Sequence, residues 1–142
     1  MTRSVRSVLS DSSIKDVAIV MTGDVTSLVP VVDASERLVG LVTERDIVIR
    51  ACAGDKSIED MRAADAMTAA PTVVGANQLL RDAVAAMTRL QVQRLPVVDD
   101  DFRVVGMISL GDIAKRADSG IDLRAALAAV SSRKLIWSRG WR

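Results

Sequence analysis

The stretch PVVDASERLVGLVTERDI, from Pro30 to Ile47, recurs 66 residues later as PVVDDDFRVVGMISLGDI, from Pro96 to Ile113. Nine of the eighteen positions are identical, and the two stretches align without a gap. A repeat of this length is a structural unit, and one copy alone would leave an apolar face poorly covered. The repeat therefore predicts two copies of one folding unit packed together.

Within each copy the apolar pattern predicts the same order of elements. A short extended piece comes first, at residues 3–10 and again at 70–75, and a run with helical spacing follows. Two β-rich runs around a polar turn then predict a hairpin, at residues 28–42 and 95–108, and a second helix ends near Gly54 and Gly120. Asp11 and Asn77 are the expected N-caps of the first helices. We therefore expect an α/β fold of the α+β type, with two β-α-β-β-α repeats related by a pseudo-two-fold axis.

This pattern divides the chain into four parts. The first copy spans residues 1–54, a connecting segment spans 55–64, the second copy spans 65–120, and a tail covers 121–142. The start of the tail has apolar residues at helical spacing and should pack on the repeats. Its end, SSRKLIWSRGWR, carries four cations and both tryptophans, which would suit a docking segment better than a polyanion site.

Composition excludes several classes of function. The chain has no histidine, so it has neither a Ser-His-Asp or Cys-His catalytic site nor a His-ligated zinc site. Its one cysteine, Cys52, falls in an apolar helical run and is expected to be a buried thiol. A net charge of +1 gives no reason to expect a nucleic-acid partner. No stretch approaches the ~20 apolar residues of a membrane span, and the start does not look like a signal peptide. We expect a cytoplasmic protein without a membrane partner.

The repeated motif resembles the CBS domain, named after cystathionine β-synthase. The shared pattern is an apolar residue, Pro-Val, a turn, and then Gly-apolar-apolar-Thr/Ser-x-x-Asp, as in VPVVD…VGLVTERDI and LPVVD…VGMISLGDI. A tandem pair of such motifs resembles a Bateman module. AADAMTAAPTVV also looks like the Met-containing segment that opens a CBS motif, and the first copy lacks such a segment.

The resemblance implies a regulatory fold with two clefts between the repeats, in which family members commonly hold adenine nucleotides or related compounds. It implies that Asp46 and Asp112 bind the ribose hydroxyls and that Thr43 and Ser109 contact phosphate. It also implies that the Pro-Val steps line the pocket of the base, and these are Val29, Pro30 and Val31 in the first copy and Leu95, Pro96 and Val97 in the second.

The residues themselves support two roles for the Thr/Ser-x-x-Asp positions. Thr43 and Ser109 lie where a strand becomes a helix, and a helix N-terminus suits a phosphate. A carboxylate three residues later can accept two hydrogen bonds from a diol, and Arg45 adds a cation in the first copy. The same spacing also suits a capping box that serves only the helix. The two roles do not exclude each other.

Gly40 and Gly106 interrupt the apolar runs of the second strand in each copy. Glycine weakens a strand interior and often marks a bulge or a close approach by another group. We therefore expect either a bulge or a close approach at Gly40 and at Gly106.

Three functions remain open. The first is a regulatory module that binds AMP, ADP, ATP or another adenosine compound, forms a homodimer and modulates a client protein. The second is a ligand-free dimerisation or protein-interaction module with degenerate clefts. The third, an enzyme using Asp46 or Asp112 as a base, lacks a nucleophile or metal-ligand partner nearby in the sequence, so we expect no catalytic residue, metal or cofactor.

Overall fold

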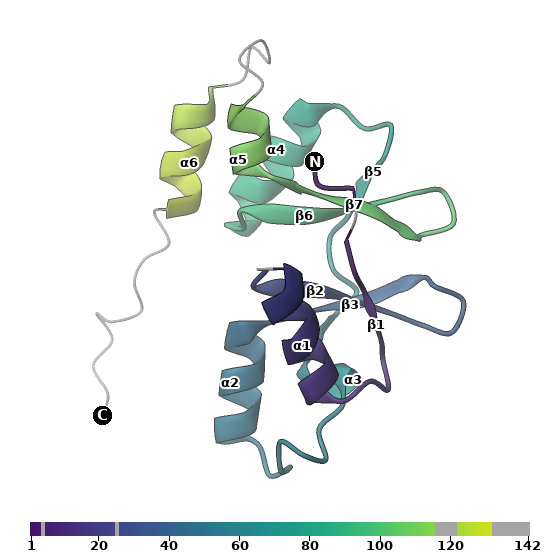
Figure 1. Ribbon diagram of the computed structural model, residues 1–142. Coiled ribbons are helices and arrows are strands. Elements are labelled where there is room, and N and C mark those ends of the chain that lie inside the picture. The colour runs from purple at the N-terminus through teal and green to yellow at the C-terminus, as the bar shows by residue number, and fades with distance from the viewer. Residues whose placement is uncertain (4, 25, 116–121, 132–142) are drawn as a thin grey trace, which may run out of the picture.

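The computed structural model describes residues 1–3, 5–24, 26–115 and 122–131. Figure 1 shows two α/β halves whose small sheets face each other in the middle of the molecule, with the helices on the outer sides. The predicted mixed α/β fold with two packed repeats is confirmed.

Each copy follows the predicted order of elements. The first copy consists of β1 (Val8–Leu9), α1 (Ile14–Asp24), β2 (Leu28–Val32), β3 (Leu38–Thr43) and α2 (Glu44–Ala53). The second consists of β5 (Val74–Gly75), α4 (Leu80–Leu90), β6 (Arg94–Val98), β7 (Val104–Ser109) and α5 (Leu110–Ala114). Between them lie α3 (Ala63–Ala66) and β4 (Thr68–Ala69), and α6 (Leu123–Ser131) follows the second copy. The expected helix end at Gly120 and the basic end of the tail lie outside the described residues.

An edge of each sheet pairs with a segment from the other copy. In one sheet β1 is parallel to β2, β2 is antiparallel to β3, and β3 pairs with β4, which precedes the second copy. In the other, β5, β6 and β7 repeat this arrangement, and Thr2 forms an antiparallel bridge with Met107 of β7. Thr2 and Thr68 are 66 residues apart. The segment that opens each copy therefore pairs with the last strand of the other copy, β7 or β3, and this pairing joins the two halves.

The aspartate after each Pro-Val-Val run organises the hairpin turn. Asp33 Oδ1 accepts hydrogen bonds from the amides two and four residues later, at 2.8 and 3.0 Å. Asp99 Oδ1 does the same at 3.0 and 2.8 Å. The two hairpins meet where the amide of Leu38 donates to the carbonyl of Phe102 at 2.9 Å. The same local chemistry thus builds the turn of both hairpins.

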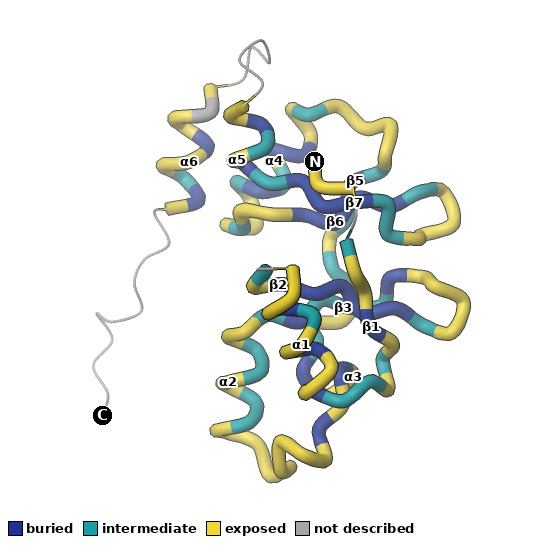
Figure 2. The backbone as a smooth tube through the Cα atoms, in the orientation of Figure 1, coloured by how far each residue is buried: buried dark blue, intermediate teal, exposed yellow. Residues whose placement is uncertain are grey.

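Each half has its own aliphatic core, and the tail helix adds to only one of them. Figure 2 shows that the central strands are buried and that the outer helices have exposed sides. In the first half the core includes Val17, Val29 and Val42, which are fully buried. In the second half Ala126 and Val130 of α6 join the core formed by α4 and the sheet. The predicted packing of the tail helix is confirmed.

Three local expectations were wrong or need refinement. Ser13, not Asp11, caps α1, because its hydroxyl accepts from the Asp16 amide at 3.1 Å and donates to Asp16 Oδ2 at 2.6 Å. Asn77 does not cap α4, which begins after Leu79 without a side-chain cap. Cys52 is exposed rather than buried. Among the described residues, no helix is both long and apolar enough to cross a membrane.

Candidate functional site

The Thr/Ser-x-x-Asp positions form a complete capping box in both copies. The Thr43 hydroxyl accepts from the Asp46 amide at 3.1 Å and donates to Asp46 Oδ2 at 2.6 Å, and the Thr43 amide donates to the same oxygen at 3.0 Å. Ser109 and Asp112 repeat these contacts at 3.0, 2.7 and 3.0 Å. The helix-capping role considered from the sequence is therefore confirmed. The cap uses Oδ2 of each aspartate, and Oδ1 takes no part in it.

The two strand glycines allow a close approach by the exchanged edges. A Cβ on Gly40 would lie within 2.9 Å of the Met67 side chain, and one on Gly106 would lie 2.7 Å from the carbonyl oxygen of Thr2 and 2.9 Å from Met1 Sδ. The predicted close approach is confirmed, and its partners are equivalent residues of the two copies. Met1 and Thr2 are thus the opening segment that the first copy was expected to lack.

One large cleft lies between the two copies, with a volume of about 730 Å³. This is within the ~300–1,000 Å³ typical of small-molecule sites. Copy one contributes the start of β2, the end of β3 and the first turn of α2, while copy two contributes the end of α4 and the start of β6. The lining residues are Ser27, Leu28, Leu41, Thr43, Glu44, Arg45, Asp46, Thr68, Ala70, Pro71, Thr72, Leu90, Gln91, Val92, Gln93, Arg94, Leu95 and Val130. We call this the copy-one cleft, because its polar end is the first capping box.

The copy-one cleft has an apolar wall and a charged end. Leucine and valine side chains from both copies form the wall, and Val130 places α6 there as well. At the charged end Arg45 is exposed, and Arg94 reaches across the copies to donate to the Ser27 hydroxyl at 3.4 Å. Asp46 is half-buried, and its Oδ1 has no hydrogen-bond partner among the described residues. The cleft therefore offers two cations, the free Oδ1 of Asp46 and the exposed carboxylate of Glu44 beside an apolar surface.

The structure brings only some of the sequence-predicted residues into this cleft. Thr43, Arg45, Asp46 and Leu95 line it together. The other Pro-Val residues, namely Val29, Pro30, Val31, Pro96 and Val97, are buried in β2 and β6 and are not among its lining residues. Ser109 and Asp112 lie outside it, at the pseudo-symmetric position, which we call the copy-two site.

The copy-two site has a different electrostatic environment. The Met1 amino group lies 3.7 Å from Asp112 Oδ1. Burial alone would raise the pKa of Asp112. The hydrogen bonds from Ser109 and the nearby positive charges of Met1 and Lys115 outweigh it, so the pKa lies below its ordinary value. The Asp112 carboxylate thus already interacts with positive charges of the chain itself.

Sequence reasoning missed the far wall of the copy-one cleft. Gln91, with a left-handed φ of 55°, ends α4 and turns the chain into the cleft together with Val92. Thr72 and Leu90 complete this side. These residues lie outside the repeated motif, so only the pairing of the two copies could have placed them at the site.

The two repeated halves, with a cleft between them, define this protein as a tandem-repeat module. The sequence profile of the CBS domain matches residues 1–51 and 63–119, and the chain belongs to the CBS domain family. A CBS domain-containing protein of Bacillus subtilis, YhcV, is 30% identical over 139 residues, which cover 95% of this chain and 94% of the relative. The inosine-5'-monophosphate dehydrogenase of Methanocaldococcus jannaschii is 34% identical over 116 residues, but the match spans only 22% of that enzyme's length and 80% of this chain.

Solved structures of CBS domain proteins have the same fold. CBSX2 in complex with AMP matches with a TM-score of 0.71 and 26% identity, covering 82% of this chain and 91% of that one. The CBS domain pair of protein MJ0100, in complex with 5'-methylthioadenosine and S-adenosyl-L-methionine, matches with a TM-score of 0.69 and 26% identity, covering 82% and 93%. Both of these similar proteins hold adenosine compounds.

Proposed function

We propose that this CBS domain pair is a regulatory module that binds an adenine nucleotide or another adenosine compound in the copy-one cleft and thereby modulates a client protein. The observation that carries this proposal is the placement of Asp46, Arg45 and Arg94 at one end of an apolar cleft shared by both copies. The adenosine compounds in the similar structures CBSX2 and MJ0100 support the same ligand class.

Each part of the cleft suits one part of such a ligand. The free Oδ1 of Asp46 can accept hydrogen bonds from the ribose hydroxyls while Oδ2 maintains the helix cap. Arg45 and Arg94 are cations that can bind phosphate, and Thr43 lies at the positive end of α2. Leu28 and Leu95 offer apolar surface to the base. The buried Pro-Val residues beside them in β2 and β6 would hold this surface in place.

The proposed role is binding without turnover. A regulatory site needs only that the ligand favour one conformation of the module over another. Neither AMP nor ATP should be hydrolysed by the purified protein. Hydrolysis that disappears in Asp46→Ala would identify an enzyme instead.

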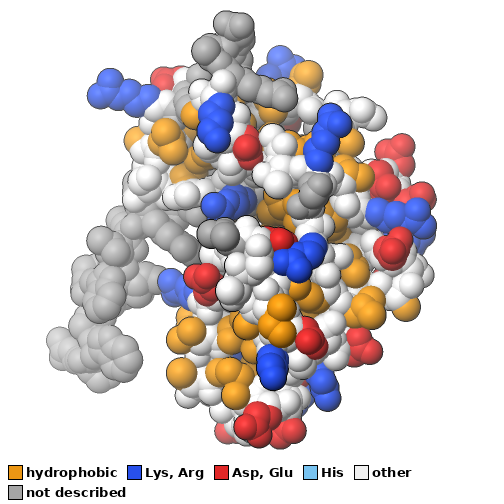
Figure 3. Space-filling view, viewed as in Figure 1, with side chains coloured by type: hydrophobic (Ala, Val, Ile, Leu, Met, Phe, Trp, Pro, Cys, Tyr) orange, Lys and Arg blue, Asp and Glu red, His pale blue; other side chains and the backbone are white. Residues whose placement is uncertain are grey.

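We further propose that the module forms a homodimer through the outer helices of copy one. Ile19 of α1 and Val48 and Ile49 of α2 are exposed large apolar residues, and Figure 3 shows hydrophobic side chains gathered over this part of the surface. Contiguous apolar surface of this kind marks interaction sites. Val48→Asp should convert a dimer into a monomer in sedimentation experiments, whereas Ile58→Asp, in the connecting segment, should not. A wild type that sediments as a monomer at all micromolar concentrations would refute this part of the proposal.

A thermal-shift screen tests the ligand proposal. AMP, ADP, ATP, S-adenosylmethionine and NAD should be compared with GMP and with Asp46→Asn protein. A ligand at 100 times its dissociation constant adds about 2.7 kcal/mol of stability, which corresponds to a shift on the order of 10 °C for a chain of this size. If no adenosine compound at millimolar concentration shifts the folded protein, the proposed function is wrong.

A further inference from the structure

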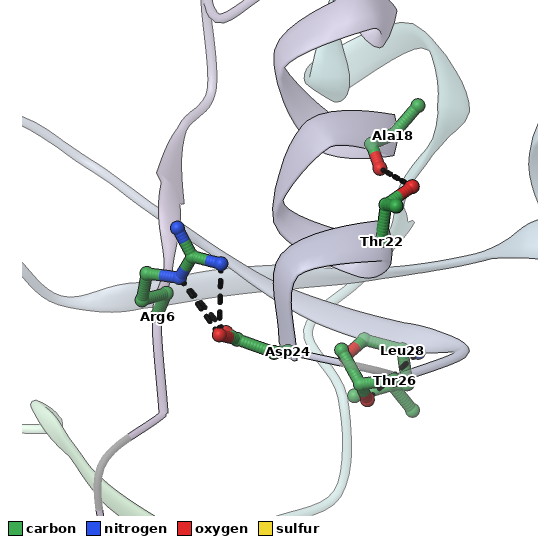
Figure 4. Close-up of polar contacts among 6 residues, drawn as sticks. All are labelled: Arg6, Ala18, Thr22, Asp24, Thr26 and Leu28. Atoms are coloured by element: carbon green, nitrogen blue, oxygen red, sulfur yellow. Dashed lines mark hydrogen bonds and ion pairs between the residues drawn. The ribbon is translucent and has the colours of Figure 1, made fainter.

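Two residues that face the open cleft in one copy have counterparts that form an ion pair in the other. The 66-residue offset relates Thr72 to Arg6 and Leu90 to Asp24. Thr72 and Leu90 both line the copy-one cleft. Arg6 Nε lies 2.9 and 3.0 Å from the two carboxylate oxygens of Asp24, and Arg6 Nη2 lies 2.8 Å from Oδ1. Figure 4 shows the guanidinium extending from the N-terminal segment to the end of α1.

A glycine makes room for this contact. Gly23 precedes Asp24 in the last turn of α1, and a Cβ there would collide with Arg6 Nη2. Gly23 therefore lets the guanidinium lie against the helix end. Because the colliding atom is the tip of a flexible side chain, a Cβ at this position would displace Arg6 and leave the helix intact.

The ion pair joins two segments whose counterparts, Thr72 and Leu90, both line the far wall of the copy-one cleft. Arg6 follows the segment in which Thr2 and Met107 exchange two backbone hydrogen bonds of 2.9 Å. Asp24 ends α1, immediately before the residues that correspond to Gln91 and Val92. By the pseudo-symmetry of the two copies, the paired side chains lie beside Ser109 and Asp112 and fill space that Thr72 and Leu90 leave open in the copy-one cleft.

We propose that the Arg6–Asp24 ion pair closes the copy-two site, so that this protein binds its adenosine ligand in the copy-one cleft alone. The inference rests on the proposed function for its ligand. The ion pair itself is a feature of the unliganded chain and can be tested separately. Both side chains are partly exposed and such pairs contribute little to folding, so substitution of the pair should remove the closure and leave the fold intact.

Reciprocal exchange of the two pairs of residues is the sharpest test. Arg6→Thr/Asp24→Leu gives the copy-two site the residues of the open cleft, and Thr72→Arg/Leu90→Asp places the ion pair in the copy-one cleft. In calorimetric titrations with AMP, wild type should bind one nucleotide per chain and the first variant two. The second variant should lose at least tenfold in affinity. Gly23→Ala, which retains both charges but displaces Arg6, should behave like the first variant.

Hydrogen exchange tests the closure without a ligand. The Met107 amide, which donates to Thr2, should exchange faster in Arg6→Thr/Asp24→Leu and in Gly23→Ala than in wild type. The Leu41 amide in the equivalent pair with Thr68 should be unchanged. If wild type binds AMP and the stoichiometry stays at one in every variant, the closure is refuted. If neither wild type nor any variant binds AMP, the proposed function fails. The exchange rate of the Met107 amide then supports or refutes the closure by itself.

Discussion

Asp46→Asn should weaken ligand binding without removing the cap of α2. Asp46 Oδ2 accepts from both the amide and the hydroxyl of Thr43, at 3.0 and 2.6 Å. In the variant the amide oxygen must take this position, because the side-chain NH2 group cannot accept a hydrogen bond. The NH2 group then occupies the position of Oδ1, where a ribose hydroxyl would need an acceptor.

The magnitude follows from the contacts that are lost. A hydrogen bond to a charged group contributes about 1.5–3 kcal/mol, so the dissociation constant of AMP should rise roughly 10- to 150-fold. Since the cap is retained, the free energy of unfolding should fall by less than the ~1 kcal/mol typical of cap removal. The change therefore separates the two roles of the residue.

Asp112→Asn is the matched control, because it changes the same capping box in the other copy. Calorimetric titration with AMP gives the affinities of wild type and both variants, and urea unfolding gives their stabilities. We expect similar stabilities for the two variants and a loss of affinity only in Asp46→Asn. An equal or larger loss in Asp112→Asn would refute the assignment of the ligand to the copy-one cleft.

Three further outcomes are expected. Gly40→Ala should lower the free energy of unfolding in urea by about 1–3 kcal/mol, because its Cβ would overlap Met67, while Gly75→Ala, whose nearest neighbour is 3.6 Å away, should cost little. Val130→Ala should destabilise the protein by about 1.5–3 kcal/mol in the same assay and weaken AMP binding, because this residue belongs to both the core and the cleft wall. The hydrogen bond from Arg6 lowers the pKa of Asp24 in the folded state. The stabilisation by this ion pair is therefore present above about pH 4, and it is lost as the pH falls through the lowered pKa. The melting temperatures of wild type and Asp24→Asn should therefore converge below pH 4, and a difference that persists there would contradict this.

The repeated motif was sufficient to predict the order of elements in each copy. The hairpins were predictable because Asp33 and Asp99 follow β-rich runs and their side chains form the turns locally. The capping boxes were predictable for the same reason, since Thr43 and Asp46 are three residues apart. Short-range chemistry of this kind is visible in the sequence.

Contacts between distant segments could not be predicted in this way. Met1 and Thr2 contact β7 in the same way that Met67 and Thr68 contact β3. The residues that follow the two segments differ, so the sequence did not reveal the opening segment of the first copy. Cys52 was expected to be buried because α2 is apolar, yet none of the described residues covers its side chain, which is exposed. In copy two α6 packs against α4 and α5, and the repeat contains no signal for this difference.

An NMR titration of the amide resonances with AMP tests the central claim most directly, because it reports both affinity and location. We predict saturable shifts of the amides of Thr43, Asp46 and Arg94, on both walls of the copy-one cleft, with little change at Ser109 and Asp112. Shifts that do not saturate, or saturable shifts centred on Ser109 and Asp112, would contradict it.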